Sequence, residues 1–161
     1  MGMKLQVIIV LLLILPHIEV AGQTVEAINA EELVSLTTQE GDTTYVINFW
    51  ATWCSPCVKE IGFFEKLHQE YKNQTLKVIL VSLDFPNQLD RRVIPFLEEK
   101  GISAEVKIMT DTDYNAWIDR VDPSWSGAIP ATLIYQGDRR LFLEKEVTYK
   151  ELINKVHQIH M

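Results

Sequence analysis

The chain has 161 residues, of which 47% are hydrophobic and 23% are charged, and its formal net charge at pH 7 is −7. This length suits one domain with a core of its own. The acidic excess argues against a nucleic-acid partner, because binding phosphates requires a dense face of Lys and Arg. The pairs Arg91-Arg92 and Arg139-Arg140 are isolated, and we interpret them as solvated charges.

The first 22 residues have the layout of a secretory signal peptide. A short basic start ends at Lys4, residues 5–15 are almost entirely apolar, and small residues precede Gln23. The apolar run is shorter than the roughly 20 residues that span a membrane. We therefore expect a signal peptide over residues 1–22 and one domain over residues 23–161, exported to the periplasm or cell envelope. The alternative is that the segment stays uncleaved as a membrane anchor.

The rest of the chain alternates between strand-like and helix-like stretches, which predicts a three-layer α/β domain. Strands are expected where β-branched and aromatic residues form short apolar runs, and a hairpin turn is expected at residues 136–138. The expected strands cover part of 23–28, then 45–50, 76–83, 106–109, 131–135 and 141–145.

Helices are expected where a polar cap precedes apolar residues at helical spacing. Residues 29–32 and 148–151 form two capping boxes, and residues 111–113 are expected to cap a small helix. Pro95 is expected to kink or divide the helix in which it lies. The expected helical stretches begin after the first capping box and end before Gly41, then cover 58–72, 87–100, about 114–118, and 149 to the end of the chain.

The chain's two cysteines, Cys54 and Cys57, lie between the strand over 45–50 and the helix that follows. Outside the cytosol, thiols tend to form disulfides, and an intramolecular bridge in this chain must join these two residues. So short a loop constrains the unfolded chain very little. A redox role is therefore favoured over an inert structural disulfide.

The start of a helix suits a reactive thiol at Cys54. Backbone N–H groups and the positive end of the helix both favour the thiolate, which is the attacking species in disulfide exchange. Cys57 follows about one turn later and can resolve a mixed disulfide. Pro56 fits the first helical turn, and Trp53 offers a flat apolar contact beside the nucleophile.

Two stretches resemble the thioredoxin superfamily and, more narrowly, the exported TlpA/ResA-like thiol–disulfide oxidoreductases. They are NFWATWCSPC over residues 48–57, with Glu60, and GAIPATL over residues 127–133. The resemblance covers roughly residues 24–160. It implies a thioredoxin fold with a central mixed sheet flanked by helices on both faces, and we expect neither a cofactor nor a metal.

The resemblance also implies the second half of a site. Pro130 takes the position of a proline that is cis in this fold and lies beside the cysteines. The backbone of Ile129 would then offer an N–H and a C=O to an extended partner peptide. Together with Trp53 and Pro56, these two residues are expected to bind the partner.

A proton acceptor for Cys57 is expected at Glu60. Thioredoxins usually carry an aspartate where this chain has Asn48, which cannot titrate, whereas TlpA/ResA-like proteins have a glutamate at the position of Glu60. Residues i and i+3 of a helix share a face, so Glu60 can approach the Cys57 sulfur and, with its pKa raised by burial, take its proton. The alternative is a surface glutamate placed near the helix start.

The resemblance therefore implies an oxidoreductase in which Cys54 attacks a partner disulfide and Cys57 resolves the intermediate. A proline at the position of Pro56 resembles the reducing members of the superfamily, and a reductant in an oxidising compartment needs a membrane thiol electron donor. The familiar task of the family is cytochrome c maturation. The expected partners are disulfide-containing exported proteins, with membrane contact only through an uncleaved N-terminal segment.

Two other functions stay open as alternatives. A thioredoxin-fold peroxidase would have Thr or Ser where Ala51 stands, three residues before Cys54. A metal-binding module would have three residues between its cysteines, one more than this chain has, together with a distant histidine.

Two further residues each allow a structural and a functional interpretation. Asp84 is a turn former or a site residue, and Trp125 packs a loop or forms part of a substrate groove.

Overall fold

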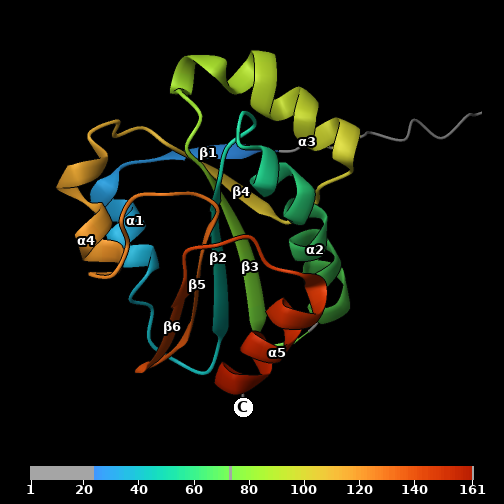
Figure 1. Ribbon diagram of the computed structural model, residues 1–161, viewed down its shortest axis with the longest axis vertical. Helices are drawn as coiled ribbons and strands as arrows, with labels where there is room; N and C mark the ends of the chain where they lie inside the picture. The colour runs from blue at the N-terminus through green and yellow to red at the C-terminus, as the bar shows by residue number, and fades with distance from the viewer. Residues whose placement is uncertain (1–23, 73, 161) are drawn as a thin grey trace, which may run out of the picture.

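A six-stranded mixed sheet forms the centre of the protein (Figure 1). The computed structural model describes residues 24–72 and 74–160. The strand order is β1-β4-β3-β2-β5-β6; the first four strands of this order are parallel, and β5 and β6 each run antiparallel to the preceding neighbour. The strands are β1 (Val25–Ile28), β2 (Thr44–Trp50), β3 (Leu76–Ser82), β4 (Glu105–Met109), β5 (Ala131–Gln136) and β6 (Arg139–Leu143).

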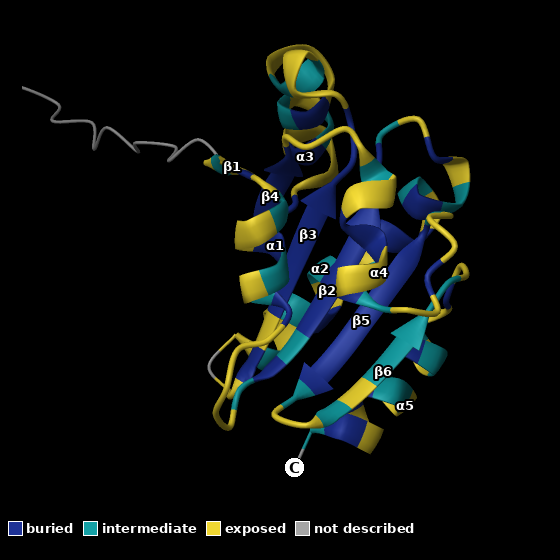
Figure 2. Ribbon diagram, turned by 90° about the vertical axis from the view of Figure 1, so that its left-hand side faces the viewer, coloured by how far each residue is buried: buried dark blue, intermediate teal, exposed yellow. Residues whose placement is uncertain are grey.

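Helices cover both faces of this sheet, which confirms the predicted three-layer α/β architecture. α2, α3 and α5 lie on one side, and α1 and α4 lie on the other (Figures 1 and 2). The α-helices are α1 (Ala30–Leu36), α2 (Ser55–Tyr71), α3 (Ile94–Lys100), α4 (Ile118–Val121) and α5 (Tyr149–Ile159). Short 3₁₀ segments cover Pro86–Gln88 and Tyr114–Ala116, and a π-helical turn covers Leu89–Val93.

The central strands supply side chains to two separate cores. Successive residues of a strand point to opposite faces, so in β2 Val46 packs with α2, α3 and α5, while Phe49 packs with α4 and the loop that follows it. β2, β3 and β5 are buried along almost their whole length, whereas β6 is half-buried (Figure 2). Burial on both faces explains why these strands are continuous apolar runs.

The local predictions hold where the partners are near in sequence. Asn29 and Glu32 form the predicted capping box at the start of α1. The Thr148 side chain accepts from the Glu151 N–H, while the Glu151 carboxylate pairs with Lys145. Thr148 therefore caps α5 as predicted, but the other half of the predicted capping box does not form, because the Glu151 carboxylate is used by Lys145.

The cap predicted at residues 111–113 is wrong. That segment leads into a 3₁₀ turn and then α4, and the Asp113 side chain makes no capping hydrogen bond. The Asp111 carboxylate instead accepts from the Ala30 N–H (2.8 Å), at the start of α1. The acceptor therefore serves a helix 81 residues earlier, which no local pattern can indicate.

Two other boundaries are set by backbone chemistry. The predicted division at Pro95 is confirmed, because α3 begins at Ile94 after the 3₁₀ and π turns. Gly101 ends α3 with a left-handed backbone (φ 62°), as expected for a C-terminal glycine. β6 starts two residues earlier than the predicted Leu141.

No helix among residues 24–72 and 74–160 is long and apolar enough to cross a membrane. The signal peptide predicted over residues 1–22 lies outside the described residues.

Candidate redox site

Cys54 and Cys57 form a disulfide at the N-terminus of α2. Cys54 is the N-cap residue, and the backbone N–H of Cys57 donates to its Sγ (3.3 Å). This is the contact expected at a helix start, and it favours negative charge on that sulfur. Cys54 is 6% exposed and Cys57 is fully buried. Of the two sulfurs, the geometry makes that of Cys54 the one a partner can reach.

The turn that carries Cys54 is fixed by Asp84, just beyond the end of β3. Its buried carboxylate accepts from the Thr52 N–H (2.9 Å) and the Thr52 hydroxyl (2.6 Å). It also accepts from the Ser82 hydroxyl (2.8 Å). Asp84 therefore holds the turn at Thr52, two residues before the nucleophile.

The second half of the site comes from the loop before β5. The Ile129–Pro130 peptide bond is cis, as the resemblance implies. The carbonyl oxygen of Ile129 lies 3.7 Å from Cys54 Sγ. Gly127 has φ 94°, a conformation that L side chains rarely adopt, and it turns the chain toward this position. Residues 75 positions apart in sequence are thus brought together at the disulfide.

A shallow apolar pocket of about 70 Å³ adjoins the disulfide and is lined in part by Trp53, Ile129, Tyr114 and Trp125. Trp53 is 58% exposed. Trp125 is almost fully buried, packs against Phe49 (ring centroids 4.5 Å apart) and donates through Nε1 to the Ala128 carbonyl (2.9 Å). Trp125 therefore packs the loop and also lines this pocket, while the use of the pocket as a substrate groove stays a prediction.

Beneath the cysteines lies a buried polar cluster. Glu60 is fully buried, so the alternative of a surface glutamate is wrong. Its carboxylate accepts from Asn48 Nδ2 (3.1 Å) and from the Val147 N–H (2.7 Å). Asn48 Nδ2 also donates to Thr132 Oγ1 (3.1 Å). The Asn48 Oδ1 atom has no hydrogen-bond partner among the described residues.

Burial raises the pKa of Glu60 to about 7, because the charged form loses its hydration. The hydrogen bonds from Val147 and Asn48 oppose this rise, and the nearby charge of Glu146 adds to it. Glu60 therefore changes its protonation near neutral pH. It lies one helical turn from Cys57, which is equally buried.

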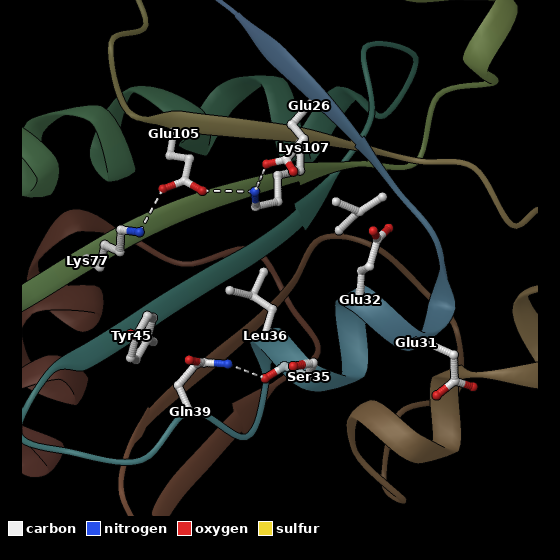
Figure 3. A pocket seen from close by; sticks show the side chains of 11 residues that line it. Glu26, Glu31, Glu32, Ser35, Leu36, Gln39, Tyr45, Lys77, Glu105 and Lys107 are labelled. Carbon is white, nitrogen blue, oxygen red and sulfur yellow. Dashed lines mark hydrogen bonds and ion pairs between the residues drawn. The ribbon is translucent and has the colours of Figure 1, made fainter.

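A larger pocket, about 530 Å³, lies elsewhere, between α1 and the face formed by β1, β4 and β3 (Figure 3). Both of its lysines are paired with carboxylates of the lining. Lys107 pairs with Glu26 and with Glu105 (3.0 Å), and Lys77 pairs with Glu105 (3.0 Å). Within residues 24–72 and 74–160, no group of three or more His, Cys, Asp or Glu side chains could hold a metal ion.

Sequence reasoning missed several residues that shape the site. It gave Asn48 as a group that cannot titrate, but not as a hydrogen-bond donor to Glu60. It also missed Thr132 and the backbone of Val147. One signal existed for Thr132: it is the second residue of the strand after Pro130, and β5 pairs with β2 so that Thr132 lies opposite Asn48. No local signal pointed to Val147, which is 87 residues from Glu60.

A family comparison decides where this arrangement belongs. The model of the AhpC/TSA family matches residues 15–141, well over half of the chain. The chain belongs to the AhpC/TSA family. Its fold is thioredoxin-like: a solved structure described as a DsbF homologue from Corynebacterium diphtheriae superposes with a TM-score of 0.60 at 19% identity, covering 78% of this chain and 76% of that one.

Two curated relatives match part of the chain. The chain is 41% identical over 54 residues to the thiol-disulfide oxidoreductase ResA of Oceanobacillus iheyensis, covering 34% of this chain and 28% of the relative. It is 35% identical over 77 residues to ResA of Halalkalibacterium halodurans, covering 48% and 42%. The matches thus span less than half the length of these relatives. They confirm the predicted resemblance of this chain to ResA-like proteins.

Proposed function

We propose that the protein is a thiol–disulfide oxidoreductase that exchanges disulfides with partner proteins. The observation that carries the proposal is the Cys54–Cys57 disulfide at a helix start, with the Cys57 N–H directed at Cys54 Sγ. The ResA relatives, named thiol-disulfide oxidoreductases, support it.

The exchange has two steps in the reducing direction. The Cys54 thiolate attacks one sulfur of a partner disulfide, so a Cys54–partner bond forms and the other partner sulfur leaves as a thiolate that takes a proton. Cys57 then loses its proton and attacks Cys54 Sγ, which releases the second partner thiol and forms the Cys54–Cys57 disulfide. Two electrons and two protons pass to the partner.

Glu60 is the proton acceptor for Cys57 in this proposal. A base with a pKa near the working pH combines availability with proton affinity, and burial raises the pKa of Glu60 to about 7. Asn48 and Val147 hold the carboxylate one turn from Cys57. Full burial keeps the transfer away from bulk water.

The partner is held by backbone and apolar contacts. Ile129, next to Cys54 Sγ, offers its backbone to an extended peptide. The exposed ring of Trp53 and the groove lined by Trp125 receive apolar side chains, and Pro56 borders the nucleophile in the first turn of α2. Pro130 shapes the segment that presents Ile129.

We also propose that the protein is exported and works as a reductant in the periplasm or cell envelope. The signal-like residues 1–22 support export, and Pro56 supports the direction by resemblance. A reductant there must be reset by a membrane thiol electron donor. Apoproteins that need free haem-attachment thiols, as in cytochrome c maturation, are the substrates proposed.

The decisive experiment is trapping with a Cys57→Ser variant. Cys54 then holds its partner as a mixed disulfide that reducing agent releases, while the matched Cys54→Ser variant traps nothing. Equal trapping by both variants, or by neither, refutes the exchange mechanism. Capture of haem-attachment apoproteins supports the maturation role, and capture of many unrelated proteins supports a general reductant.

Two assays separate the alternatives. A peroxidase would consume peroxide with an added thiol reductant at a rate that the Cys54→Ser variant abolishes. A metal-binding module would be purified with stoichiometric copper or zinc.

A further inference from the structure

Glu144 directly follows β6 and accepts hydrogen bonds from the loop that leads to Pro130. Its Oε1 accepts from the Ala128 N–H (3.0 Å) and from the Ser126 hydroxyl, and its Oε2 accepts from the Ser126 N–H (3.2 Å). One carboxylate thus collects three donors from residues 126–128. These residues are exposed, so the loop is held by this side chain rather than by burial.

Residues 126–128, which Glu144 holds, lead directly to Ile129, whose backbone is proposed to bind the partner. Ala128 precedes Ile129, whose carbonyl oxygen lies 3.7 Å from Cys54 Sγ. The Trp125 indole holds the Ala128 carbonyl from the other side (2.9 Å). Gly127, between the two residues that Glu144 holds, has φ 94° and no side chain to restrict its backbone. A displaced Ala128 would therefore displace Ile129.

The charge of Glu144 suits this task. Partial burial acts to raise the pKa of Glu144, but the hydrogen bonds from Ser126 and Ala128 outweigh it and hold the pKa below its usual range. The side chain is therefore ionised at neutral pH, and hydrogen bonds to an ionised acceptor are about twice as strong as neutral ones.

We propose that Glu144 is a positioning residue that fixes residues 126–128 and so presents the Ile129 backbone to a partner's disulfide at Cys54. The inference rests on the proposed function, since presentation matters only if a partner binds. The segment that begins with Glu144 runs on to Val147, whose N–H holds Glu60 (2.7 Å), and Figure 1 shows it crossing from β6 to α5 beside α2. Glu144 and Val147, three residues apart, thus contact the two halves of the site.

The functional test compares Glu144→Ala and Glu144→Gln with Glu40→Gln, a control at an exposed glutamate between α1 and β2. Each reduced protein is assayed with a disulfide-bonded peptide and with oxidised glutathione, which is too short for strand-like pairing. Loss of the anchor should raise KM for the peptide about tenfold in Glu144→Ala, with kcat nearly unchanged. The rate with oxidised glutathione should stay within about twofold.

Glu144→Gln should show a smaller rise in KM, because its amide oxygen can still accept from Ala128 and the Ser126 hydroxyl while its NH₂ cannot accept from the Ser126 N–H. Equal KM values for all variants would overturn the inference. So would a loss of rate that is the same for the peptide and oxidised glutathione, since that marks general damage. If Glu144→Ala fails to fold, Glu144→Gln and Ser126→Ala carry the same comparison.

A second measurement needs no turnover. In the oxidised protein, the amides of Ser126 and Ala128 should exchange hydrogen at least tenfold faster in Glu144→Ala than in wild type, while amides in β2 are unchanged. Unchanged exchange at these two amides would refute the anchor. If the wild-type protein reacts with no disulfide substrate at all, the proposed function fails. Hydrogen exchange at these two amides still decides whether Glu144 fixes the loop.

Discussion

Replacing Glu60 with Gln tests the buried carboxyl group most directly. The pKa of Glu60 rises from 4.5 to about 7 because the folded protein buries its charge. At about 1.4 kcal/mol for each pH unit, this corresponds to about 3 kcal/mol of folding free energy. The folded state binds this proton more tightly than the unfolded state. The stabilisation is therefore fully present below pH 4.5 and is lost as the pH rises through about 7.

Urea unfolding of the oxidised proteins between pH 4 and 8 measures this contribution. As the pH rises through that window, the unfolding free energy of wild type should fall by about 3 kcal/mol relative to Glu60→Gln. The rate of disulfide exchange should also lose an inflection near pH 7 in the variant. If the unfolding free energies of the two proteins change in parallel with pH over this window, Glu60 does not titrate there and the proton-transfer role fails.

Glu65→Gln is the matched control on the same helix. Burial acts to raise the pKa of Glu65, but hydrogen bonds from Gln69, Ser103 and the Ala104 N–H outweigh it, so the pKa lies below its usual value. The sign is then opposite: Glu65 stabilises the fold above pH 4.5 and loses this effect as the pH falls below it. The control should therefore keep the wild-type change between pH 4.5 and 7.

Three further substitutions test the groove and the turn. Trp53→Ala removes an exposed ring, so stability should change by less than about 0.5 kcal/mol while peptide KM rises about tenfold. Trp125→Ala empties a buried site beside Phe49 and should cost about 3–5 kcal/mol in urea unfolding; equal stability of the two variants would contradict these placements. Asp84→Ala leaves the Thr52 donors unpaired and should cost about 1–3 kcal/mol, with a slower reaction of Cys54 toward an alkylating agent; an unchanged rate would show that the turn holds without this carboxylate.

The predictions that succeeded depend on neighbours in the chain. Hydrophobic runs indicated the strands, the Asn29 box indicated the start of α1, and Pro95 marked the division before α3, since each pattern acts over a few residues. The cap expected at Asp111–Asp113 failed for the opposite reason. The Asp111 carboxylate accepts instead from Ala30, which follows the neighbouring strand β1. An acidic residue near a helix start shows that an acceptor is available, but not which donor it will meet.

The sequence by itself determined the reacting pair and its local setting. Two cysteines in the first turn of a helix, behind a buried strand, place Cys54 where N–H groups favour a thiolate, and this chemistry needs only residues 50–57. The tertiary structure decided the surroundings. Glu60 has a pKa of about 7 because folding buries it between Asn48 and Val147. The Ile129 carbonyl lies 3.7 Å from Cys54 Sγ, in a loop whose Ala128 hydrogen-bonds to Glu144 and to the Trp125 indole. Burial and contacts between distant residues arise from packing the whole sheet, which no short stretch of sequence encodes.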